Sequence, residues 1–234
     1  MAVRSVYLPD VPVADNRIRI GGEAHRHLAV ARIEPGETVE VFDGRGGVWV
    51  AAVESAGKRE TIVKVTDSRK VERDPVEIVL GLAMIKIPAF ELALEKAVEV
   101  GVARVIPFTA NRSNLAPGNR HDRWHRILVE AVKQSKHYFV PLLDGLKTFD
   151  EIVSVSAASK IIFAERRGGP LKPALSGSPI LYLIGPEGGW ADRELVAADA
   201  AGFKTVSLGR AILKAETAAI VGAALIRYEM GNWP

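Results

Sequence analysis

The chain contains no cysteine among its 234 residues. Disulfide bonds and cysteine-based zinc or redox sites are therefore excluded, and a reducing compartment is compatible with the composition. Clustered histidines are scarce as well. His121 and His125 lie four residues apart, but no third ligand and no HExxH motif accompany them. We therefore expect no metal centre.

Long apolar runs are also lacking. No stretch approaches the 18 uncharged apolar residues that indicate a transmembrane helix. An export signal needs an uninterrupted apolar core, and charged residues interrupt the first 25 positions: Arg4, Asp10, Asp15, Arg17 and Arg19. We expect no membrane span and a cytoplasmic location. A composition of 48% hydrophobic and 25% charged residues is typical of a soluble globular protein.

The net charge of +3 is too small to indicate a partner, so its distribution carries more information. Residues 1–75 hold twelve Lys and Arg against twelve Asp and Glu, whereas residues 112–137 hold six basic and two acidic residues. A solvated helix face and a nucleic-acid-binding surface both produce such a basic segment. The charge pattern alone leaves both interpretations open.

The pattern of apolar and polar residues divides the chain into two parts. Residues 38–66 alternate apolar and polar positions, with "DGRGG" supplying a hairpin turn, which predicts a β-meander in a small β-barrel domain over residues 1–72. After Pro75, apolar strands alternate with helical periodicity, which predicts an α/β domain with a mostly parallel sheet over residues 73–234. The expected strands are "VEIVLGLAMI", "ARVIPFT", "KIIFAE", "PILYLIG" and "KTVSLG". The expected helices cover about residues 88–101, 120–136, 191–202 and 215–230.

Three of the expected strands end in loops of unusual composition, at residues 163–165, 185–189 and 208–217. In open parallel sheets, ligands bind beyond the carboxyl ends of the strands. "GPEGG" at 185–189 fits a binding loop, and equally a strand-to-helix turn whose glycines serve geometry alone. In the third loop, Ile212 and Leu213 would waste apolar burial unless they cover a flat apolar ligand such as a purine.

The chain resembles the SPOUT class of S-adenosylmethionine-dependent RNA methyltransferases. Within that class it is similar to the family, often called RsmE, that methylates N3 of a uridine in 16S ribosomal RNA. The matching stretches run in order over nearly the whole chain: "HRHLAVARIEPGETVEVFDGRGG", "EKAVEVGVARVIPFTANRS", "RWHRILVEAVKQSKHYFVP", "LIGPEGGW" and "SLGRAILKAETAA". The resemblance implies a PUA-like RNA-binding barrel followed by a domain with a C-terminal trefoil knot, which brings the three loops together.

The resemblance also implies the site residues. S-adenosylmethionine is the expected cofactor, with Ile212 and Leu213 around the adenine and the methionine end against residues 185–189. The full set of expected cofactor-binding residues is Ala164, Glu165, Ile184, Gly185, Pro186, Gly188, Gly189, Leu208, Gly209, Ile212 and Leu213. Expected contacts to 16S rRNA, on the assembled small subunit near the decoding centre, are His25, Arg32, Lys86, Arg112, Lys133, Lys136 and His137. For His25 and Arg32, a structural role fits equally well. We expect loss of Arg112 or Lys133 to weaken RNA binding and to spare cofactor affinity.

The catalytic candidates near the loops are Lys214, Arg210 and Glu187. Methyl transfer to N3 requires the uracil to lose a proton. The site therefore needs at least a cation near the uracil oxygens and a group or water molecule that takes up the proton. Lys214 fits the cation, and fits equally a helix-start residue that satisfies local carbonyls. Glu187 either faces the ligands or holds backbone amides of its turn. Glu216 and Thr217 are expected to cap a helix.

Three departures from the family pattern bear on these roles. The family commonly has Arg where this chain has Lys214, Thr where it has Ala215, and Arg where it has His137. Two alternatives therefore stay open: a SPOUT methyltransferase with another RNA target, and an RNA-binding ribosome-assembly factor without catalysis.

A homodimer is also expected. Family members pair through the knotted domain, and the closing helix carries a stripe of mostly small residues that could admit another helix: Ala219, Gly222, Ala223 and Ile226. The same stripe would serve a helix buried in its own domain.

Overall fold

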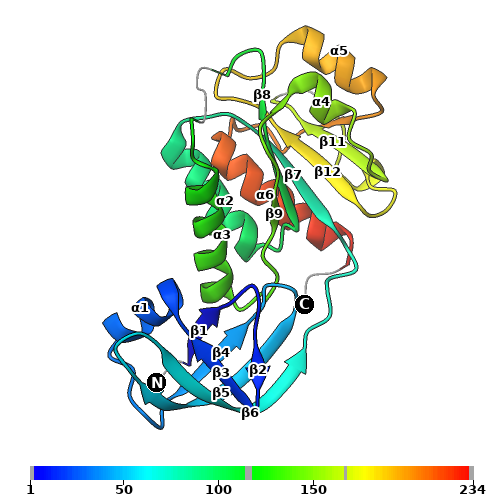
Figure 1. Cartoon of the computed structure of the whole chain (residues 1–234). Helices are drawn as coiled ribbons and strands as arrows, with labels where there is room; N and C mark the ends of the chain where they lie inside the picture. The colour runs from blue at the N-terminus through cyan, green and yellow to red at the C-terminus, as the bar shows by residue number, and fades with distance from the viewer. Residues whose placement is uncertain (1–2, 114–117, 166–167, 232–234) are drawn as a thin grey trace. The chain divides into compact units, whose positions relative to one another are not determined.

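The computed structural model describes residues 3–113, 118–165 and 168–231. The chain forms two compact units (Figure 1). Unit 1 comprises Met1–Arg73 and Val132–Val140, and unit 2 comprises Asp74–Ala131 and Pro141–Pro234. The sequence-based division at residues 72 and 73 thus needs one addition. The segment Val132–Val140, which lies within the expected second domain, packs with unit 1.

Unit 1 is built on a six-stranded sheet with one helix. Its elements are β1 (Arg4–Tyr7), β2 (Val13–Ala14), β3 (Arg17–Ile20), α1 (Gly22–Val30), β4 (Thr38–Phe42), β5 (Gly47–Ala56) and β6 (Thr61–Lys70). The strand order is β1-β4-β5-β6-β3-β2. β1 runs parallel to β4, and the other neighbours are antiparallel. The consecutive strands β4, β5 and β6 form the β-meander that the alternating pattern predicted.

The sheet of unit 1 curves around its own core. Apolar side chains from β1, β3, β4, β5 and β6 are buried together in one cluster, for example Val6, Ile18, Val41, Val53 and Val63. A flat sheet would spread these side chains along its length, so a single shared cluster requires curvature. This is the form expected of a small barrel-like domain.

A buried carboxylate fixes the segment Val132–Val140 within unit 1. Glu40 on β4 is 8% exposed and accepts hydrogen bonds from Lys136 Nζ at 2.8 Å and from the Tyr138 hydroxyl at 2.9 Å. Arg69 Nη2 donates to the same carboxylate at 3.1 Å. Burial raises the pKa of Glu40, but hydrogen bonds from these three donors outweigh it and hold the pKa below its ordinary value.

Unit 2 is an α/β layer structure. Its elements are β7 (Ile78–Ala83), α2 (Ile87–Glu99), β8 (Arg104–Thr109), α3 (His121–Ser135, which ends in unit 1), β9 (Leu142–Leu143), β10 (Lys147–Thr148), α4 (Phe149–Val153), β11 (Ser159–Phe163), a 3-10 turn (Lys172–Ala174), β12 (Ile180–Ile184), α5 (Asp192–Ala200), β13 (Lys204–Val206) and α6 (Ala215–Glu229). The strand order is β10-β8-β7-β12-β11-β13, with β9 also paired to β8, and every pairing is parallel. The predicted α/β class with a mostly parallel sheet is confirmed.

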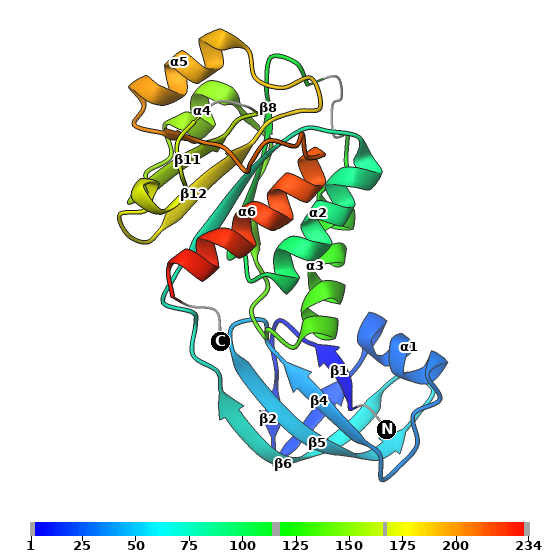
Figure 2. The ribbon, with the colours of Figure 1, turned by 180° about the vertical axis from the view of Figure 1, so that it is seen from behind.

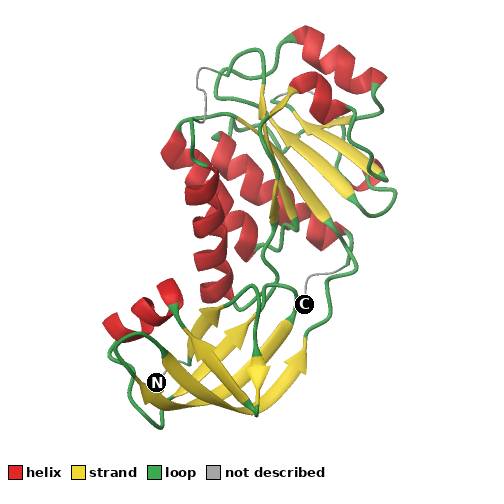
Figure 3. Cartoon of the chain, viewed as in Figure 1, coloured by secondary structure: helices red, strands yellow, loops and turns green. Residues whose placement is uncertain are grey.

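Helices cover both faces of this sheet (Figure 3). Successive residues of β12 point to opposite faces, and the Tyr182 hydroxyl donates to the Ala219 carbonyl of α6 at 2.9 Å. On the other face, Leu183 belongs to a core cluster that includes Ile152 of α4 and Ala198 of α5. In Figure 2, α6 lies in front of the strands and beside α2. The sheet is therefore buried on both sides, as its continuous apolar strands require.

β13 is contacted by β11 and by the segment that begins at Gly168. β13 pairs with β11 on one side, while Gly169, which follows β11, forms a parallel bridge to Val206 on the other side. The chain then returns to β12, which lies on the opposite side of β11. A Cβ on Gly168 would lie 2.6 Å from the Thr205 carbonyl oxygen, so only glycine allows this close approach. β13 thus has β11 on one side and Gly169 on the other.

The stripe of mostly small residues on α6 packs against other parts of unit 2. Ala219, Gly222, Ala223 and Ile226 are all buried against the unit's own sheet and helices. A Cβ on Gly222 would lie 2.8 Å from the ring of Phe163. These small residues therefore allow α6 to approach its own sheet, and the use of this stripe as support for a dimer was wrong.

Candidate active site

One cavity collects the loops at the carboxyl edge of the sheet in unit 2. Because all strands run parallel, the segments that follow β7, β8, β11, β12 and β13 leave from the same edge. They line a cavity of about 1020 Å³, which includes Lys86 after β7, Arg112 after β8 and Glu165 after β11. Residues 185–190, 207–209 and 211–214 contribute most of the remaining wall. All eleven residues expected around the cofactor line this cavity.

The loop after β12 is shaped by close packing at its glycines. A Cβ on Gly185 would lie 2.8 Å from the ring of Trp190, so the ring occupies the space beside this backbone. Gly189 has a φ of +69°, in the left-handed region that side chains disfavour, and its amide donates to the Pro186 carbonyl at 2.8 Å. The loop is a tight turn whose backbone forms part of the cavity wall.

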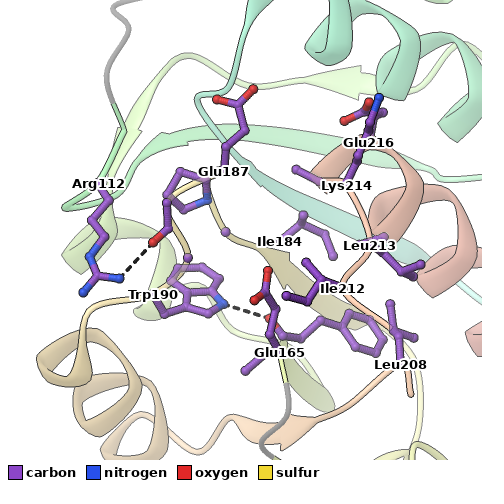
Figure 4. Close-up of a pocket in the computed structure, with 18 of the residues that line it drawn as sticks. Arg112, Glu165, Ile184, Glu187, Trp190, Leu208, Ile212, Leu213, Lys214 and Glu216 are labelled. Carbon is purple, nitrogen blue, oxygen red and sulfur yellow. Dashed lines mark hydrogen bonds between the residues drawn. The ribbon is translucent and has the colours of Figure 1, made fainter. Parts of the chain in front are cut away.

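Trp190 connects this loop to the end of β11. Its Nε1 donates to the Phe163 carbonyl at 2.8 Å, and its ring stacks on Phe108 at a centroid distance of 6.1 Å (Figure 4). Phe149 meets the same ring edge-on at 5.8 Å. Sequence analysis gave Trp190 no role. The available signal was its position at the end of "LIGPEGGW", where a large ring follows two glycines.

The loop after β8 is attached to the loop after β12. Arg112 Nη1 donates to the Gly188 carbonyl at 2.8 Å (Figure 4). Behind this bond, the buried carboxylate of Glu194 accepts the Asn111 amide at 2.7 Å and the Ala191 amide at 2.9 Å. Sequence analysis did not identify Glu194, which is only 4% exposed and lies at the start of α5.

The loop after β13 presents apolar side chains to the cavity. Ile212 is 57% exposed although it is aliphatic, while Leu208 and Leu213 are half-buried. Figure 4 shows these side chains together with Ile184 on one side of the cavity and Arg112 on the other. Gly209 has a φ of +118°, which lets the chain turn before Ile212. An exposed apolar wall of this kind suits a flat apolar ligand group.

Charged side chains of both signs surround the apolar wall. The lining contains four carboxylates, those of Glu165, Glu187, Asp192 and Glu216, and three cations, those of Lys86, Arg112 and Lys214. In Figure 4, the Glu187 carboxylate extends away from the Trp190 ring. Arg210, the third catalytic candidate, is exposed and does not line the cavity. The one-charge excess of carboxylates favours a ligand with net positive charge.

The residues expected to contact RNA do not form one group. Lys86 and Arg112 line the cavity in unit 2, and Arg32 is exposed in unit 1. Lys133, Lys136 and His137 all belong to the segment that packs with unit 1, where Lys136 is held by Glu40.

For His25, burial favours the structural alternative. It is only 6% exposed, and its Nδ1 lies 3.0 Å from the hydroxyl of Thr61, which is itself 1% exposed. The helix α1 turns this side chain into the core of unit 1, so His25 has a structural role and little surface for RNA.

Within the ranges that the structure describes, no group of three His, Cys, Asp or Glu side chains is arranged to hold a metal ion. Over the same ranges, no helix is both long enough and apolar enough to cross a membrane.

Comparison with known proteins agrees with this architecture. Residues 72–227 match the family model of the RNA methyltransferase domain, and residues 20–66 match that of the RNA methyltransferase PUA domain. Ribosomal RNA small subunit methyltransferase E from Synechocystis is 31% identical over 237 residues, which cover 97% of this chain and 77% of the relative. The protein of the same name from Rickettsia conorii is 26% identical over 97% of this chain and 96% of its own length.

Solved structures agree as well. The crystal structure of ribosomal RNA small subunit methyltransferase E from Neisseria gonorrhoeae, bound to S-adenosyl methionine, has a TM-score of 0.89 at 28% identity and covers 97% of this chain and 98% of that chain. A putative methyltransferase from Legionella pneumophila, in complex with bound S-adenosylmethionine, has a TM-score of 0.90 at 26% identity with the same coverage. The predicted pairing of a PUA-like domain with an RNA methyltransferase domain is confirmed, and the chain belongs to the family of ribosomal RNA small subunit methyltransferase E.

Proposed function

We propose that this protein transfers the methyl group of S-adenosylmethionine to N3 of a uridine in 16S ribosomal RNA, on the small ribosomal subunit. The observation that carries the proposal is the cavity at the carboxyl edge of the parallel sheet, which gathers the "GPEGG" and "LGRAILK" loops. Membership of the family and the S-adenosylmethionine bound to two similar solved proteins support the cofactor. An enzyme with this substrate works in the cytoplasm, where ribosomes lie.

The cavity residues fit this cofactor. A volume of about 1020 Å³ is at the upper end for small-molecule sites. Ile212, Leu213 and Leu208 offer the apolar surface that an adenine ring needs, and the one-charge excess of carboxylates favours a sulfonium compound. The Gly185–Gly189 backbone lines the rest of this wall and can contact the methionine end of S-adenosylmethionine. When bound, the cofactor supplies an electrophilic methyl group next to these residues.

The chain's own side chains can prepare the uracil. Loss of the N3 proton spreads negative charge onto the flanking oxygens, so a nearby cation lowers the barrier. Lys214 and Lys86 are exposed cations in the cavity lining, and we assign Lys214 this role because it directly follows the apolar wall. Glu187 is an exposed carboxylate of the same lining and is the proposed acceptor of the proton, directly or through water. Arg210 receives no role because it lies outside the lining.

RNA recognition is assigned to both units. Lys86 and Arg112 place positive charge at the cavity, and Arg32 does so on unit 1. We include Lys133 and His137 in the RNA surface because they belong to the basic segment, and we leave out His25 because it is buried. Phosphate contacts of this kind position the RNA without reading its sequence.

Two measurements test the proposal. Calorimetric titration with S-adenosylmethionine comes first, and the absence of binding would favour a non-catalytic assembly factor. Mass spectrometry of nucleosides from small subunits of a deletion strain, before and after incubation with the protein and cofactor, comes second. We expect 3-methyluridine to appear only after incubation, whereas a methylated ribose or another modified base would assign a different RNA target.

We further infer a homodimer as the working form. The stripe of Ala219 and Gly222 no longer supports it, but Leu225 and Tyr228 lie three residues apart on α6 and are 40% and 70% exposed. A twofold interface between identical subunits is the commonest way to cover such side chains. Sedimentation equilibrium at micromolar concentration tests this inference. A mass near 25.3 kDa for a fully active protein would refute it.

A further inference from the structure

The peptide group that joins Gly188 to Gly189 takes part in two hydrogen bonds. Gly188 and Gly189 follow each other, and glycine populates a wide range of conformations. The N–H of this group, on Gly189, donates to the Pro186 carbonyl and closes the turn, while its carbonyl, on Gly188, accepts from outside the loop. A donor from outside the loop therefore adds a second restraint to this part of the cavity wall.

Arg112 supplies that donor from another strand end. Its Nη1 lies 2.8 Å from the Gly188 carbonyl oxygen. Its stem also packs on the same residue, because a Cβ on Gly188 would lie 3.1 Å from Arg112 Cβ and 3.5 Å from its Cδ. Contact and hydrogen bond together limit the rotation of the Gly188 peptide. Both residues line the cavity.

The base of Arg112 is itself held rigidly. The neighbouring Asn111 amide donates to the Glu194 carboxylate, which also accepts the Ala191 amide at the far end of the glycine loop. Glu194 is 4% exposed, so this double acceptor is protected from competition with water. Residues 110–113 and 185–191 are thus joined at two points, the bond from Arg112 to Gly188 and the Glu194 carboxylate.

We propose that Arg112 is a positioning residue for the cofactor, which holds the Gly188 carbonyl so that the glycine loop is ordered before the ligand arrives. This rests on the proposed function only for the identity of the ligand, S-adenosylmethionine. It differs from a role in RNA binding alone, which would leave cofactor affinity unchanged when no RNA is present. A guanidinium has five N–H donors, so one bond to Gly188 leaves others for a phosphate.

The test is a calorimetric titration of the full chain with S-adenosylmethionine in the absence of RNA. Arg112→Met keeps an unbranched stem and removes the guanidinium, and we expect its Kd to rise about three- to tenfold, the range for one lost hydrogen bond. Arg112→Lys keeps one charged donor and should fall between this variant and the wild type. Arg193→Met is the matched control, because Arg193 is exposed on α5 and lies outside the cavity lining.

A second measurement does not depend on the ligand. Hydrogen exchange of the peptide that covers residues 185–191, read by mass spectrometry without cofactor, should be faster in Arg112→Met than in the wild type and unchanged in Arg193→Met. Unchanged Kd and exchange in a folded Arg112→Met protein would overturn the proposal. An equal loss of affinity in Arg193→Met would also overturn it, because a general charge effect would then suffice. If the wild type binds no cofactor, the proposed function fails, and the exchange rates alone decide the positioning role.

Discussion

The cavity loops and the basic segment at residues 112–137 were both selected from sequence, and they behave differently in the structure. The eleven residues expected around the cofactor all line one cavity. The cations of the basic segment go to separate partners. Arg112 donates to the Gly188 carbonyl, Arg123 forms a bidentate pair with Glu91 at 2.6 and 2.7 Å, and Lys136 donates to Glu40.

The difference has a physical origin. Loops that follow parallel strands must leave from the same edge of the sheet, so the backbone itself brings them together. A lysine or arginine has a long, flexible side chain that can form a hydrogen bond or ion pair with any carboxylate or carbonyl within its reach. Its partner depends on tertiary contacts that no local pattern records. Positions fixed by the backbone are therefore more predictable than partners chosen by side chains.

The sharpest way to break this comparison is Gly189→Val. At a φ of +69°, a β-branched residue is strained, and its Cβ would meet nothing within 4 Å, so the cost is conformational and not a clash. We expect the affinity for S-adenosylmethionine to fall by more than about 30-fold, or roughly 2 kcal/mol, because the cavity wall must change shape to relieve the strain. Calorimetry measures this change.

Gly145→Val is the control for this substitution. Gly145 lies in unit 2 outside the cavity lining, a Cβ there also meets nothing within 4 Å, and its φ is not in the strained region. Its cofactor affinity should equal that of the wild type. A folded Gly189→Val protein with wild-type affinity would show that the glycine loop is only a turn.

Glu40→Gln tests the other region in the comparison, the basic segment, through the ion pair between Lys136 and Glu40. The neutral amide that replaces the carboxylate loses the ion-pair attraction to Lys136 and Arg69 and has one acceptor oxygen instead of two, so we expect the free energy of unfolding at pH 7 to fall by about 1–2 kcal/mol. Urea denaturation measures the change. Glu54→Gln is the control, since Glu54 is paired with Arg17 at the surface and should change stability less.

The same variant has a defined pH dependence. Because hydrogen bonds to its donors outweigh burial, the pKa of Glu40 is lower in the folded chain than its ordinary value of 4.5. The stabilisation is therefore complete above about pH 4.5 and is lost as the pH falls through the folded-state pKa. The difference in stability between wild type and Glu40→Gln should shrink below pH 4.5. A difference that stays constant down to the acid transition would contradict this assignment.

Arg32→Met and Lys136→Met compare an exposed and a captured cation within unit 1. Arg32 is exposed, whereas Lys136 Nζ donates to Glu40 and to the Ser5 hydroxyl. If Arg32 contacts a phosphate, its loss should lower the slope of log affinity against log salt, for binding to small subunits, by about one. Lys136→Met should leave the slope unchanged. If Lys136→Met instead lowers this slope by about one, Lys136 contacts a phosphate of the RNA.

The extent of sequence-based prediction follows the same division. The strand β12 and the helix α2 were located within a few residues, because a continuous apolar run and the spacing of Phe90, Leu94, Ala97 and Val98 depend on local chain geometry. The five-residue helix α4 and the two-residue strands β9 and β10 were missed, since such short elements carry no periodic signal. The packing of Val132–Val140 with unit 1 was missed because it depends on tertiary contacts, such as those to Glu40 and Gly44, that no local pattern records.

Trp190→Phe gives the smallest expected effect and asks how far side chains, and not only backbone, shape the cavity. Phenylalanine keeps an aromatic ring against Phe108 but removes the Nε1 donor to the Phe163 carbonyl, which lies beside Ala164 and Glu165 on the cavity wall. One neutral hydrogen bond contributes about 1 kcal/mol, so the Kd for S-adenosylmethionine should rise about threefold to tenfold while the fold is retained. Trp124→Phe is the matched control, because Trp124 is also buried in unit 2, stacks on Phe90 and lies outside the lining. Equal affinities for Trp190→Phe and wild type would mean that the glycine backbone alone sets the loop. A loss in Trp190→Phe but not in Trp124→Phe would show that a side chain which sequence analysis passed over helps to place the loops that it identified.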